Sequence, residues 1–297
     1  MQVKVLAAVV TYNRLNLLKR CINYLWQQSV LPDILIIDNQ STDGTKKYLT
    51  ENNIDHVTQP NGGSSAGWFR GISEAGYRGY DHVWLMDDDG YPDAAALELL
   101  LANTDASVSC ISSVIVKENK RDEFVFGIPV LNKQGYPVLF STKRKYYKFS
   151  ELPAGTVTYP FAHLFNGALV NMANVKRVGN VDRQFFLYGD EVDYFFRLKK
   201  VGIVCSLMTA LHYHPDVSQR KIDKIRVYYF IRNTIILNKR YFDFVTHRNI
   251  LAIVVSWVRL YKRNGIVTSL SYLFGVNGKY FYYGIIDGLK NNFIKRF

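Results

Sequence analysis

Two short apolar runs within the first ninety residues each end in an aspartate, and this restricts the folds open to the chain. Ile34–Ile37 leads directly into Asp38, and His82–Met86 leads into Asp87. Continuous runs rich in aliphatic residues are typical of parallel strands buried on both faces. We therefore expect both aspartates at the carboxyl ends of buried strands, the edge of an open α/β sheet where ligands bind.

Helical patterns alternate with these strands. Val3–Val10 predicts another buried strand, and the apolar spacing of Leu15–Gln28 predicts a helix. A second helix is expected over residues 41–49, with Thr42 or Asp43 as its N-cap. Strands that alternate with helices predict an α/β fold with a mostly parallel sheet and right-handed crossovers.

The remaining chain is less regular and then becomes helical. Residues 108–170 are expected to be rich in strands, and a helix over 191–201 precedes a strand over 203–210. The composition changes near residue 219. We therefore predict an α/β domain over residues 1–219 and a helical extension over 220–297.

The extension carries the whole excess of positive charge. The net charge is +12, yet residues 1–219 hold 22 Lys and Arg and 22 Asp and Glu, whereas residues 220–297 hold 15 Lys and Arg and three Asp. The extension is also rich in aromatic and aliphatic residues, and no nucleic-acid-binding motif is present. We expect it to bind an anionic membrane surface. A helical subdomain with a solvated charged face is the alternative.

Two further features bear on location. The longest apolar run of the extension, around residues 250–258, is about half of the ~20 residues that a spanning helix needs. Cys21, Cys110 and Cys205 form no CxxC pair, which favours a reducing compartment, and the N-terminal apolar stretch is too short for a signal peptide. We expect a cytoplasmic protein, peripheral on the inner face of the cell membrane; a homo-oligomer is compatible with the sequence.

An acidic triplet follows the strand predicted at residues 82–86. Asp87, Asp88 and Asp89 are adjacent, so their carboxylates repel one another and need a compensating cation. Hard oxygen ligands suit Mg²⁺ or Mn²⁺, whose natural co-ligand is a diphosphate. Solvated loops also contain acidic triplets, but the position between a strand and Gly90 favours a metal site.

A glycine-rich segment, NGGSSAGWFRG, occupies residues 61–71, just upstream of the triplet. Small residues let backbone amides approach a ligand closely, and Arg70 can offset phosphate charge. The segment matches neither a P-loop nor a dinucleotide-binding turn. Such a loop alone is often only a turn, so its position beside the triplet is what favours ligand binding. A short helix is expected to follow over Gly71–Gly79.

A second acidic cluster opens the helix expected near residue 191. Asp190 and Glu191 lie where the helix dipole stabilises negative charge, and Asp193 and Arg197 have the spacing of an ion pair. A carboxylate near a hydroxyl substrate can act as general base. A plain acidic helix start is the alternative.

Two histidines, His212 and His214, follow a predicted strand and alternate, so they face the same side. A lone histidine is more often structural than a ligand, but two near an expected metal site make one of them a candidate ligand.

Taken in order, these motifs resemble those of family 2 glycosyltransferases, and most closely the bacterial galactofuranosyltransferases and rhamnosyltransferases of cell-wall and O-antigen synthesis. The glycine-rich loop of these enzymes commonly reads NxGGxGGFxRG; here Ser64 and Ala66 replace two glycines, and Trp68 replaces the phenylalanine. The resemblance covers about residues 1–235 and rests on Thr11-Tyr-Asn-Arg14, Ile37-Asp-Asn39, Asn61–Gly71, Asp87–Asp89, Gly189–Asp193 and Tyr228-Tyr-Phe-Ile-Arg-Asn233.

The resemblance implies a GT-A fold and a role for each matching residue. It places Glu191, with Asp190 before it, at the catalytic base, where the family usually has a second Asp. It places His214, in preference to His212, at the metal-ligand histidine. The remaining assignments are Thr11, Arg14 and Asp38 for the nucleoside, Asp87 and Asp89 for the ribose and the metal-diphosphate, and Asn61, Arg70 and Asp88 as further donor-binding residues.

The implied reaction is an inverting transfer, dependent on Mn²⁺ or Mg²⁺, from a UDP- or dTDP-linked sugar to a polysaccharide or lipid-linked glycan. Galactofuranose and rhamnose are both compatible donor sugars. The QxxRW element of processive synthases is absent from the sequence. The alternatives are a catalytically silent scaffold of a polysaccharide assembly complex and, less favoured, a sugar nucleotidyltransferase, which would carry a Gly-rich, Lys- or Arg-containing loop after the first strand.

Overall fold

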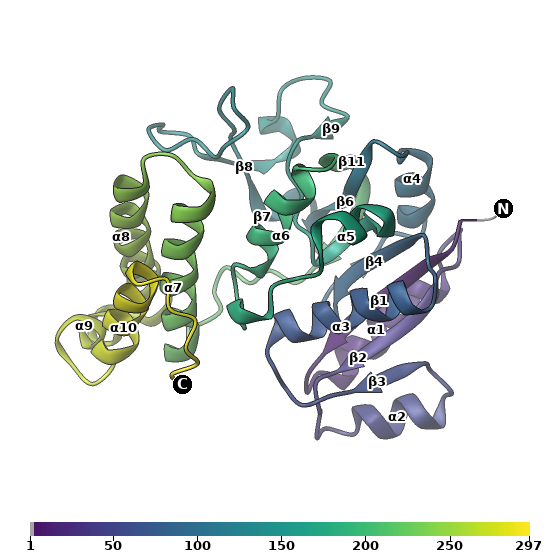
Figure 1. Ribbon diagram of the computed structural model, residues 1–297, viewed down its shortest axis with the longest axis horizontal. Helices are drawn as coiled ribbons and strands as arrows, with labels where there is room; N and C mark the ends of the chain where they lie inside the picture. Colours follow the sequence, from purple (N-terminus) through teal and green to yellow (C-terminus); the bar gives the residue numbers. More distant parts are fainter. Residues whose placement is uncertain (1–2) are drawn as a thin grey trace. The chain divides into compact units, whose positions relative to one another are not determined.

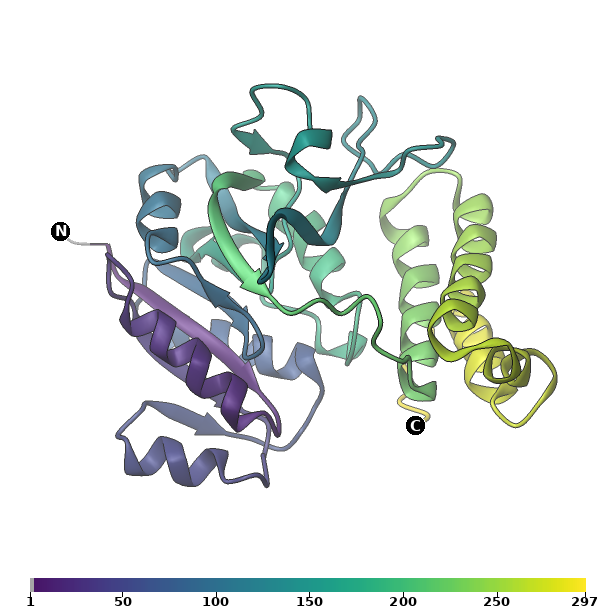
Figure 2. The same ribbon diagram turned by 180° about the vertical axis from the view of Figure 1, so that it is seen from behind.

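The computed structural model describes residues 3–297, and the chain divides into two compact units. The first unit comprises the residues up to Val181 together with Tyr194–Asp216. The second comprises Asp182–Asp193 and Val217–Phe297. Figures 1 and 2 show an α/β first unit and a helical second unit, which confirms the predicted fold class. The domain boundary at residue 219 stays a prediction.

One mixed sheet organises the first unit. Its main order is β3-β2-β1-β4-β10-β6-β11-β5; neighbours among β3, β2, β1 and β4 are parallel, and β10 runs antiparallel to both β4 and β6. The predicted parallel sheet is thus confirmed for the first four strands of this order. The strands are β1 (Val5–Thr11), β2 (Asp33–Asp38), β3 (His56–Thr58), β4 (His82–Asp87), β5 (Tyr91–Pro92), β6 (Val108–Lys117), β7 (Lys120–Pro129), β8 (Lys145–Lys148), β9 (Thr158–Tyr159), β10 (Asn166–Asn171) and β11 (Ile203–His214).

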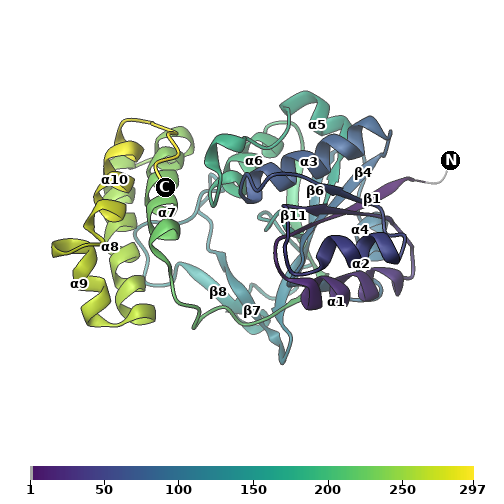
Figure 3. The same ribbon diagram turned by 90° about the horizontal axis from the view of Figure 1, so that it is seen from below.

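Helices cover both faces of this sheet (Figure 3). Alternate residues of β1 point to opposite faces, so Leu6, Ala8 and Val10 join one core and Ala7 and Val9 the other. The first core also takes side chains from α3 (Ser64–Tyr77), α5 (Met172–Val178) and the later turns of α6 (Asp190–Lys199). The second takes side chains from α1 (Leu15–Trp26), α2 (Thr45–Glu51) and α4 (Ala96–Ala102).

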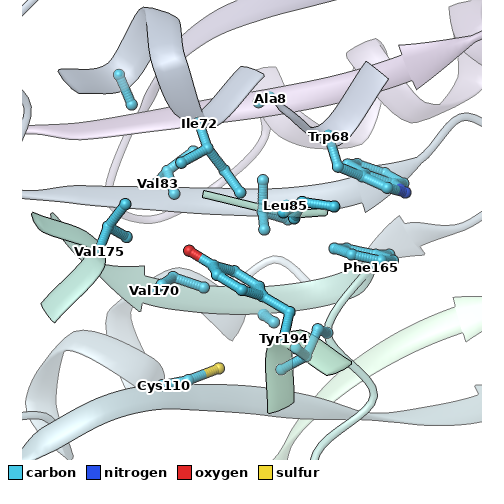
Figure 4. Close-up of a cluster of buried hydrophobic side chains, with 14 of the residues drawn as sticks. Ala8, Trp68, Ile72, Val83, Leu85, Cys110, Phe165, Val170, Val175 and Tyr194 are labelled. Carbon is cyan, nitrogen blue, oxygen red and sulfur yellow. The ribbon is translucent and has the colours of Figure 1, made fainter. Parts of the chain in front are cut away.

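Aromatic side chains fill the core beneath α3. The rings of Trp68 and Phe165 stack with centroids 4.5 Å apart and planes 9° apart (Figure 4). Tyr194, on α6, is buried in the same cluster. The indole of Trp68 is accommodated at this position by stacking on Phe165.

The glycine-rich segment was expected to be a loop, and in the structure most of it is helical. The helix α3 begins at Ser64 rather than at Gly71. A Cβ on Gly67 would lie 2.5 Å from Cγ1 of Val10, and one on Gly71 would lie 2.9 Å from Cβ of Ala8. These two glycines therefore let the helix pack closely on β1, which is a packing role rather than contact with a ligand.

The predicted N-cap of the second helix was also wrong. The helix α2 begins at Thr45, and its N-cap is Gly44, whose φ is +89°. A left-handed residue at this point favours glycine over Thr42 or Asp43. Asp43 still accepts a hydrogen bond from the backbone N–H of Thr45 at 3.2 Å.

The second unit is built on four helices, α7 (Lys224–Tyr241), α8 (Val245–Asn264), α9 (Ile266–Phe274) and α10 (Gly278–Leu289). The start of α6 and the 3₁₀ turn η2 (Arg183–Phe185) complete it. A Cβ on Gly288 would lie 2.8 Å from Cβ of Ile235, so glycine allows α10 to cross α7 closely. Among residues 3–297, no helix is both long and apolar enough to cross a bilayer.

Candidate active site

The acidic triplet lies at the carboxyl end of β4, as predicted, and residues from the end of β1 hold it. The hydroxyl of Thr11 donates to Oδ2 of Asp88 at 2.7 Å. Nη1 of Arg14 lies 2.9 Å from Oδ1 of Asp88 and 2.8 Å from Oδ2 of Asp89. One guanidinium thus offsets two of the three adjacent carboxylates.

Asp88 is only 2% exposed. Burial raises the pKa of its carboxyl to about 6, although Arg14 and the hydrogen bond from Thr11 oppose the rise. Asp88 is therefore an anchor inside the loop, and Asp87 and Asp89 flank it.

Arg20 is a residue of this site that sequence analysis missed. Its Nη2 donates to the main-chain oxygen of Asp89 at 2.8 Å, and its Nη1 lies 2.7 Å from Oε1 of Glu118. Arg14 and Arg20 are six residues apart in sequence, and both reach the loop. A spacing of six residues does not put two side chains on one face of a helix, so no local pattern indicated Arg20.

The end of β2 forms a second polar corner next to β1. Asp38 is fully buried. Its Oδ1 accepts a hydrogen bond from the backbone N–H of Ser41 at 2.9 Å, and its Oδ2 accepts one from the hydroxyl of Thr58 at 3.4 Å. Asn13 ties the two loops together, because its Oδ1 accepts from the backbone N–H of Thr42 at 2.7 Å. Thr11, Arg14 and Asp38 thus occupy adjacent strand ends; their contact with a nucleoside stays a prediction.

The two histidines of β11 have different surroundings. Nε2 of His214 lies 3.1 Å from Oδ1 of Asp89, and its Nδ1 lies 2.7 Å from the main-chain oxygen of Pro215. His212 is fully buried between two glycines: a Cβ on Gly90 would lie 2.3 Å from its Nε2, and one on Gly167 3.0 Å from its Nδ1. Burial lowers the pKa of His212 to about 3, so it stays neutral. The structure brings His214, not His212, to the triplet.

Other predicted donor-binding residues occupy positions near the start of α3. Oδ1 of Asn61 accepts from the backbone N–H of Gly63 at 3.0 Å, which shapes the turn before the helix. Arg70 forms an ion pair with Glu74 one turn along α3, with Nε 2.8 Å from Oε1. Within residues 3–297, no group of three or more His, Cys, Asp or Glu side chains is gathered closely enough to hold a metal ion.

Asp190 and Glu191 open α6, as predicted, and belong to the second compact unit. Asp190 is 3% exposed. Burial, and secondarily the charge of Glu191, raises its pKa to about 7. Glu191 is half-buried. One carboxyl of the pair therefore titrates near neutral pH, where a general base is most effective.

The next acidic residue of α6 has partners on α7. Oδ1 of Asp193 accepts from the hydroxyl of Tyr241 at 2.6 Å and lies 3.2 Å from Nη1 of Arg240. Arg197, the predicted partner of Asp193, donates to the main-chain oxygens of Val178 and Asn180 at 3.0 and 2.9 Å. The first turn of α6 is thus tied to α7.

Comparison with solved structures establishes the fold. The chain matches a mannosyltransferase of Pyrobaculum calidifontis, solved in complex with GDP-Man and Mn²⁺, with a TM-score of 0.55 and 12% identity over 97% of this chain and 87% of the other. It matches S. aureus TarS (residues 1–349) with a TM-score of 0.56 and 12% identity over 96% of this chain and 80% of the other. The fold is GT-A, the fold of nucleotide-sugar-dependent glycosyltransferases.

Sequence comparison gives the family. A profile of glycosyl transferase family 2 matches residues 7–165. The galactofuranosyltransferase GlfT1 of Mycolicibacterium smegmatis is 29% identical over 218 residues, covering 71% of this chain and 70% of the relative. Its counterpart in Mycobacterium tuberculosis is 31% identical over 223 residues, with the same coverage. The chain belongs to glycosyl transferase family 2 and is a glycosyltransferase.

Proposed function

We propose that the protein transfers a sugar, with inversion and with the aid of Mn²⁺ or Mg²⁺, from a nucleotide-sugar donor to a polysaccharide or lipid-linked glycan. The proposed metal ligands are Asp87, Asp89 and His214; the structure brings Asp89 and His214 together, and the three do not form a preformed cluster. The single observation that carries the metal assignment is the approach of His214 to Asp89, with Nε2 and Oδ1 3.1 Å apart.

The tautomer of His214 explains why this approach favours a cation. Nδ1 faces the main-chain oxygen of Pro215, which can only accept a hydrogen bond, so Nδ1 carries the proton. A neutral ring in this tautomer would present the Nε2 lone pair to a carboxylate oxygen of Asp89, whereas a protonated ring would form an ion pair with it. Two acceptors at 3.1 Å require a proton or a metal ion between them. A divalent ion held by these side chains would satisfy both acceptors.

Different residues of the chain have different proposed roles in the transfer. A bound metal ion would offset negative charge on the leaving nucleoside diphosphate. Thr11 and Arg14 hold Asp88, which keeps Asp87 and Asp89 at the edge of the sheet. Glu191, or Asp190, takes the proton of the acceptor hydroxyl as general base, worth about 10²–10⁴-fold in rate.

Calorimetric titration with Mn²⁺ in the presence of UDP tests the metal site without depending on turnover. We expect Asp89→Ala and His214→Ala to weaken Mn²⁺ binding at least tenfold. His212→Asn, a buried change two residues away, is the matched control and should retain the affinity. Equal Mn²⁺ affinity in the wild type and in both site variants would refute the assignment.

The relatives favour a particular donor. The curated relatives are galactofuranosyltransferases, and TarS structures have been determined in complex with UDP and with UDP-GlcNAc. We therefore favour UDP-galactofuranose over dTDP-rhamnose. The protein can be incubated with each donor and a panel of glycan acceptors, and the products analysed by mass spectrometry. Transfer of galactofuranose adds the mass of a hexose to the acceptor, and transfer of rhamnose adds that of a deoxyhexose. Transfer of rhamnose alone would overturn the preference.

We further propose that α8–α10 rest on an anionic membrane surface. Val267, Phe274 and Val276 are 80%, 86% and 85% exposed, and α9 carries no charged residue. Residues 245–297 hold eight Lys and Arg but one acidic side chain, Asp287, which is buried and paired with Arg296. An exposed apolar helix flanked by cations, with no exposed carboxylate, suits the headgroup region of such a bilayer.

Point substitutions test this surface better than truncation, which would expose the core of the second unit. Val267→Asp combined with Phe274→Asp should reduce sedimentation with phosphatidylserine vesicles by about tenfold or more, because both apolar contacts are lost. Tyr77→Asp, at the equally exposed end of α3, is the control. Unchanged sedimentation of the double variant, or equal binding to neutral vesicles, would contradict the proposal.

A further inference from the structure

The backbone just before the acidic pair adopts an unusual conformation. Phe186 and Tyr188 have φ values of +62° and +61°, and Gly189 follows with +88°. A bulky residue rarely adopts this conformation, which persists only where the surroundings impose it. Two such residues within three positions indicate that something holds this turn, Phe185–Gly189, in place.

Two fully buried residues of α7 supply that restraint. Nδ2 of Asn233 donates to the main-chain oxygens of Phe185, Leu187 and Tyr188 at 3.0, 2.9 and 2.7 Å. The amide has two protons for three acceptors, so at least one hydrogen bond is shared. The side chain thus gathers the carbonyls of the turn around one point.

Arg232 completes the arrangement. Its Nη2 donates to the main-chain oxygens of Gln184 and Phe185, both at 3.2 Å, and its Nε donates to Oδ1 of Asn233 at 2.8 Å. The last contact fixes the orientation of the amide, because Oδ1 must face Arg232 and Nδ2 must face the turn. Arg232 also lies over the ring of Tyr229, with Cζ 4.7 Å from the centroid.

The contact extends to the residue that adjoins the acidic pair. A Cβ on Gly189 would lie 3.0 Å from Cβ of Asn233 and 3.1 Å from Cδ1 of Leu237. Glycine is required here both by its positive φ and by this close approach. Asn233, Gly189 and Asp190 therefore form a continuous path from α7 to the first residue of α6.

We propose that Arg232 and Asn233 are positioning residues: by fixing the turn Phe185–Gly189, they set the direction in which Asp190 and Glu191 present their carboxyl groups. The pair touches neither carboxyl group and acts through the backbone. This role rests on the proposed function of Asp190 and Glu191 as the source of the general base. It explains why Arg and Asn are needed together, since one orients the other.

Asn233→Ala removes the donor to the turn, and Asn238→Ala is its matched control. Asn238 is also buried in α7, but its Nδ2 donates to Oδ1 of Asn249 at 2.9 Å, away from the turn. We expect Asn233→Ala to lower kcat by about 10–100-fold, as expected for a displaced catalytic group, with little change in the KM for the donor or in UDP binding. The limb of the pH–rate profile that reports the base should also shift.

Hydrogen exchange gives a readout that needs no substrate. The amides of residues 186–191 should exchange faster in Asn233→Ala and at the wild-type rate in Asn238→Ala. Arg232→Lys, which keeps the charge but loses the contact that orients the amide, should fall between them and serves if Asn233→Ala does not fold. Equal losses of kcat, UDP affinity and thermal stability in Asn233→Ala and Asn238→Ala would overturn the positioning role.

The two proposals can fail separately. If Asp190→Asn and Glu191→Gln both keep wild-type turnover, the base assignment is wrong whatever Asn233→Ala does. If either acidic variant is slow while Asn233→Ala keeps the wild-type pH profile and exchange rates, the acidic pair stands and the positioning role is refuted.

Discussion

The hydroxyl of Thr11 and the carboxylate of Asp88 are joined at 2.7 Å across 77 residues of sequence. This hydrogen bond connects the end of β1 to the loop that follows β4. It is the shortest link between the two strand ends on which the donor site is proposed to rest, and it makes a simple prediction.

Thr11→Val keeps the shape of the side chain but leaves a buried acceptor of Asp88 without its donor. We expect a loss of about 1–3 kcal/mol in the free energy of unfolding, because a buried polar group then lacks its partner. Thr11→Ser, which restores the hydroxyl, should recover most of it. Denaturant unfolding of the three proteins at pH 8 is the measurement, and equal stability of the Val and Ser variants would show that the bond contributes nothing.

Gly90 makes a second prediction, since His212 lies against it. Gly90→Ala places a Cβ 2.3 Å from Nε2 of His212, so either the histidine or the loop after the triplet must move. We expect a melting temperature several degrees lower and weaker Mn²⁺ binding. Gly76→Ala in α3 is the control, because the new Cβ would lie at an ordinary contact distance of 3.6 Å from Cε of Met172. This substitution should stabilise the helix by up to about 1 kcal/mol. Wild-type metal affinity in Gly90→Ala would show that the new Cβ does not displace the loop after the triplet.

The raised pKa of Asp190, about 7, predicts how stability depends on pH. Its pKa in the unfolded chain is about 3.9, so the folded state holds the proton more tightly and loses stability as pH rises from about 4 through 7. Asp190→Asn cannot titrate. Relative to the wild type, its unfolding free energy should therefore improve between pH 4 and pH 8, by up to about 4 kcal/mol.

Unfolding measured every half pH unit for both proteins tests this prediction. Any constant cost of the amide cancels in the pH-dependent difference. A difference between variant and wild type that stays flat from pH 4 to 8 would mean that Asp190 titrates normally.

The stack of Trp68 on Phe165 predicts unequal costs for two substitutions. Trp68→Phe keeps an aromatic ring on Phe165 and leaves a much smaller cavity than alanine, so we expect a loss below about 1.5 kcal/mol. Trp68→Ala leaves a cavity beneath α3 and should cost about 3–5 kcal/mol. Similar losses in the two variants, measured by denaturant unfolding, would indicate that the ring contacts do not stabilise the helix.

The strand ends and the acidic triplet were predictable because their signals are local. A buried strand shows as an apolar run, and the residue after it reaches the sheet edge whatever the rest of the chain does. The preference for His214 over His212 as a metal ligand came from the resemblance to the family, and the short distance from His214 to Asp89 agrees with it. The contact of Asp38 with Thr58, by contrast, depends on β2 and β3 being parallel neighbours.

Contacts between distant segments were not predictable. Glycines 67 and 71 look like loop residues until β1 is seen against the helix that carries them. Arg240 and Tyr241 reach Asp193 from 47 and 48 residues away, and no local spacing indicates these two contacts. Nothing near Asn233 in sequence indicates that its amide serves a turn 45 residues earlier.

The second compact unit is discontinuous, because it takes Asp182–Asp193 out of the α/β portion of the sequence. A protein shortened to residues 1–219 would keep the acidic pair but lose all of α7, leaving the carbonyls of Phe185, Leu187 and Tyr188 without the amide that gathers them. If Asp190 and Glu191 supply the base as proposed, a protein cut at the change in composition would keep both carboxyl groups but lose the residues that fix the turn before them, so we expect it to lack transfer activity.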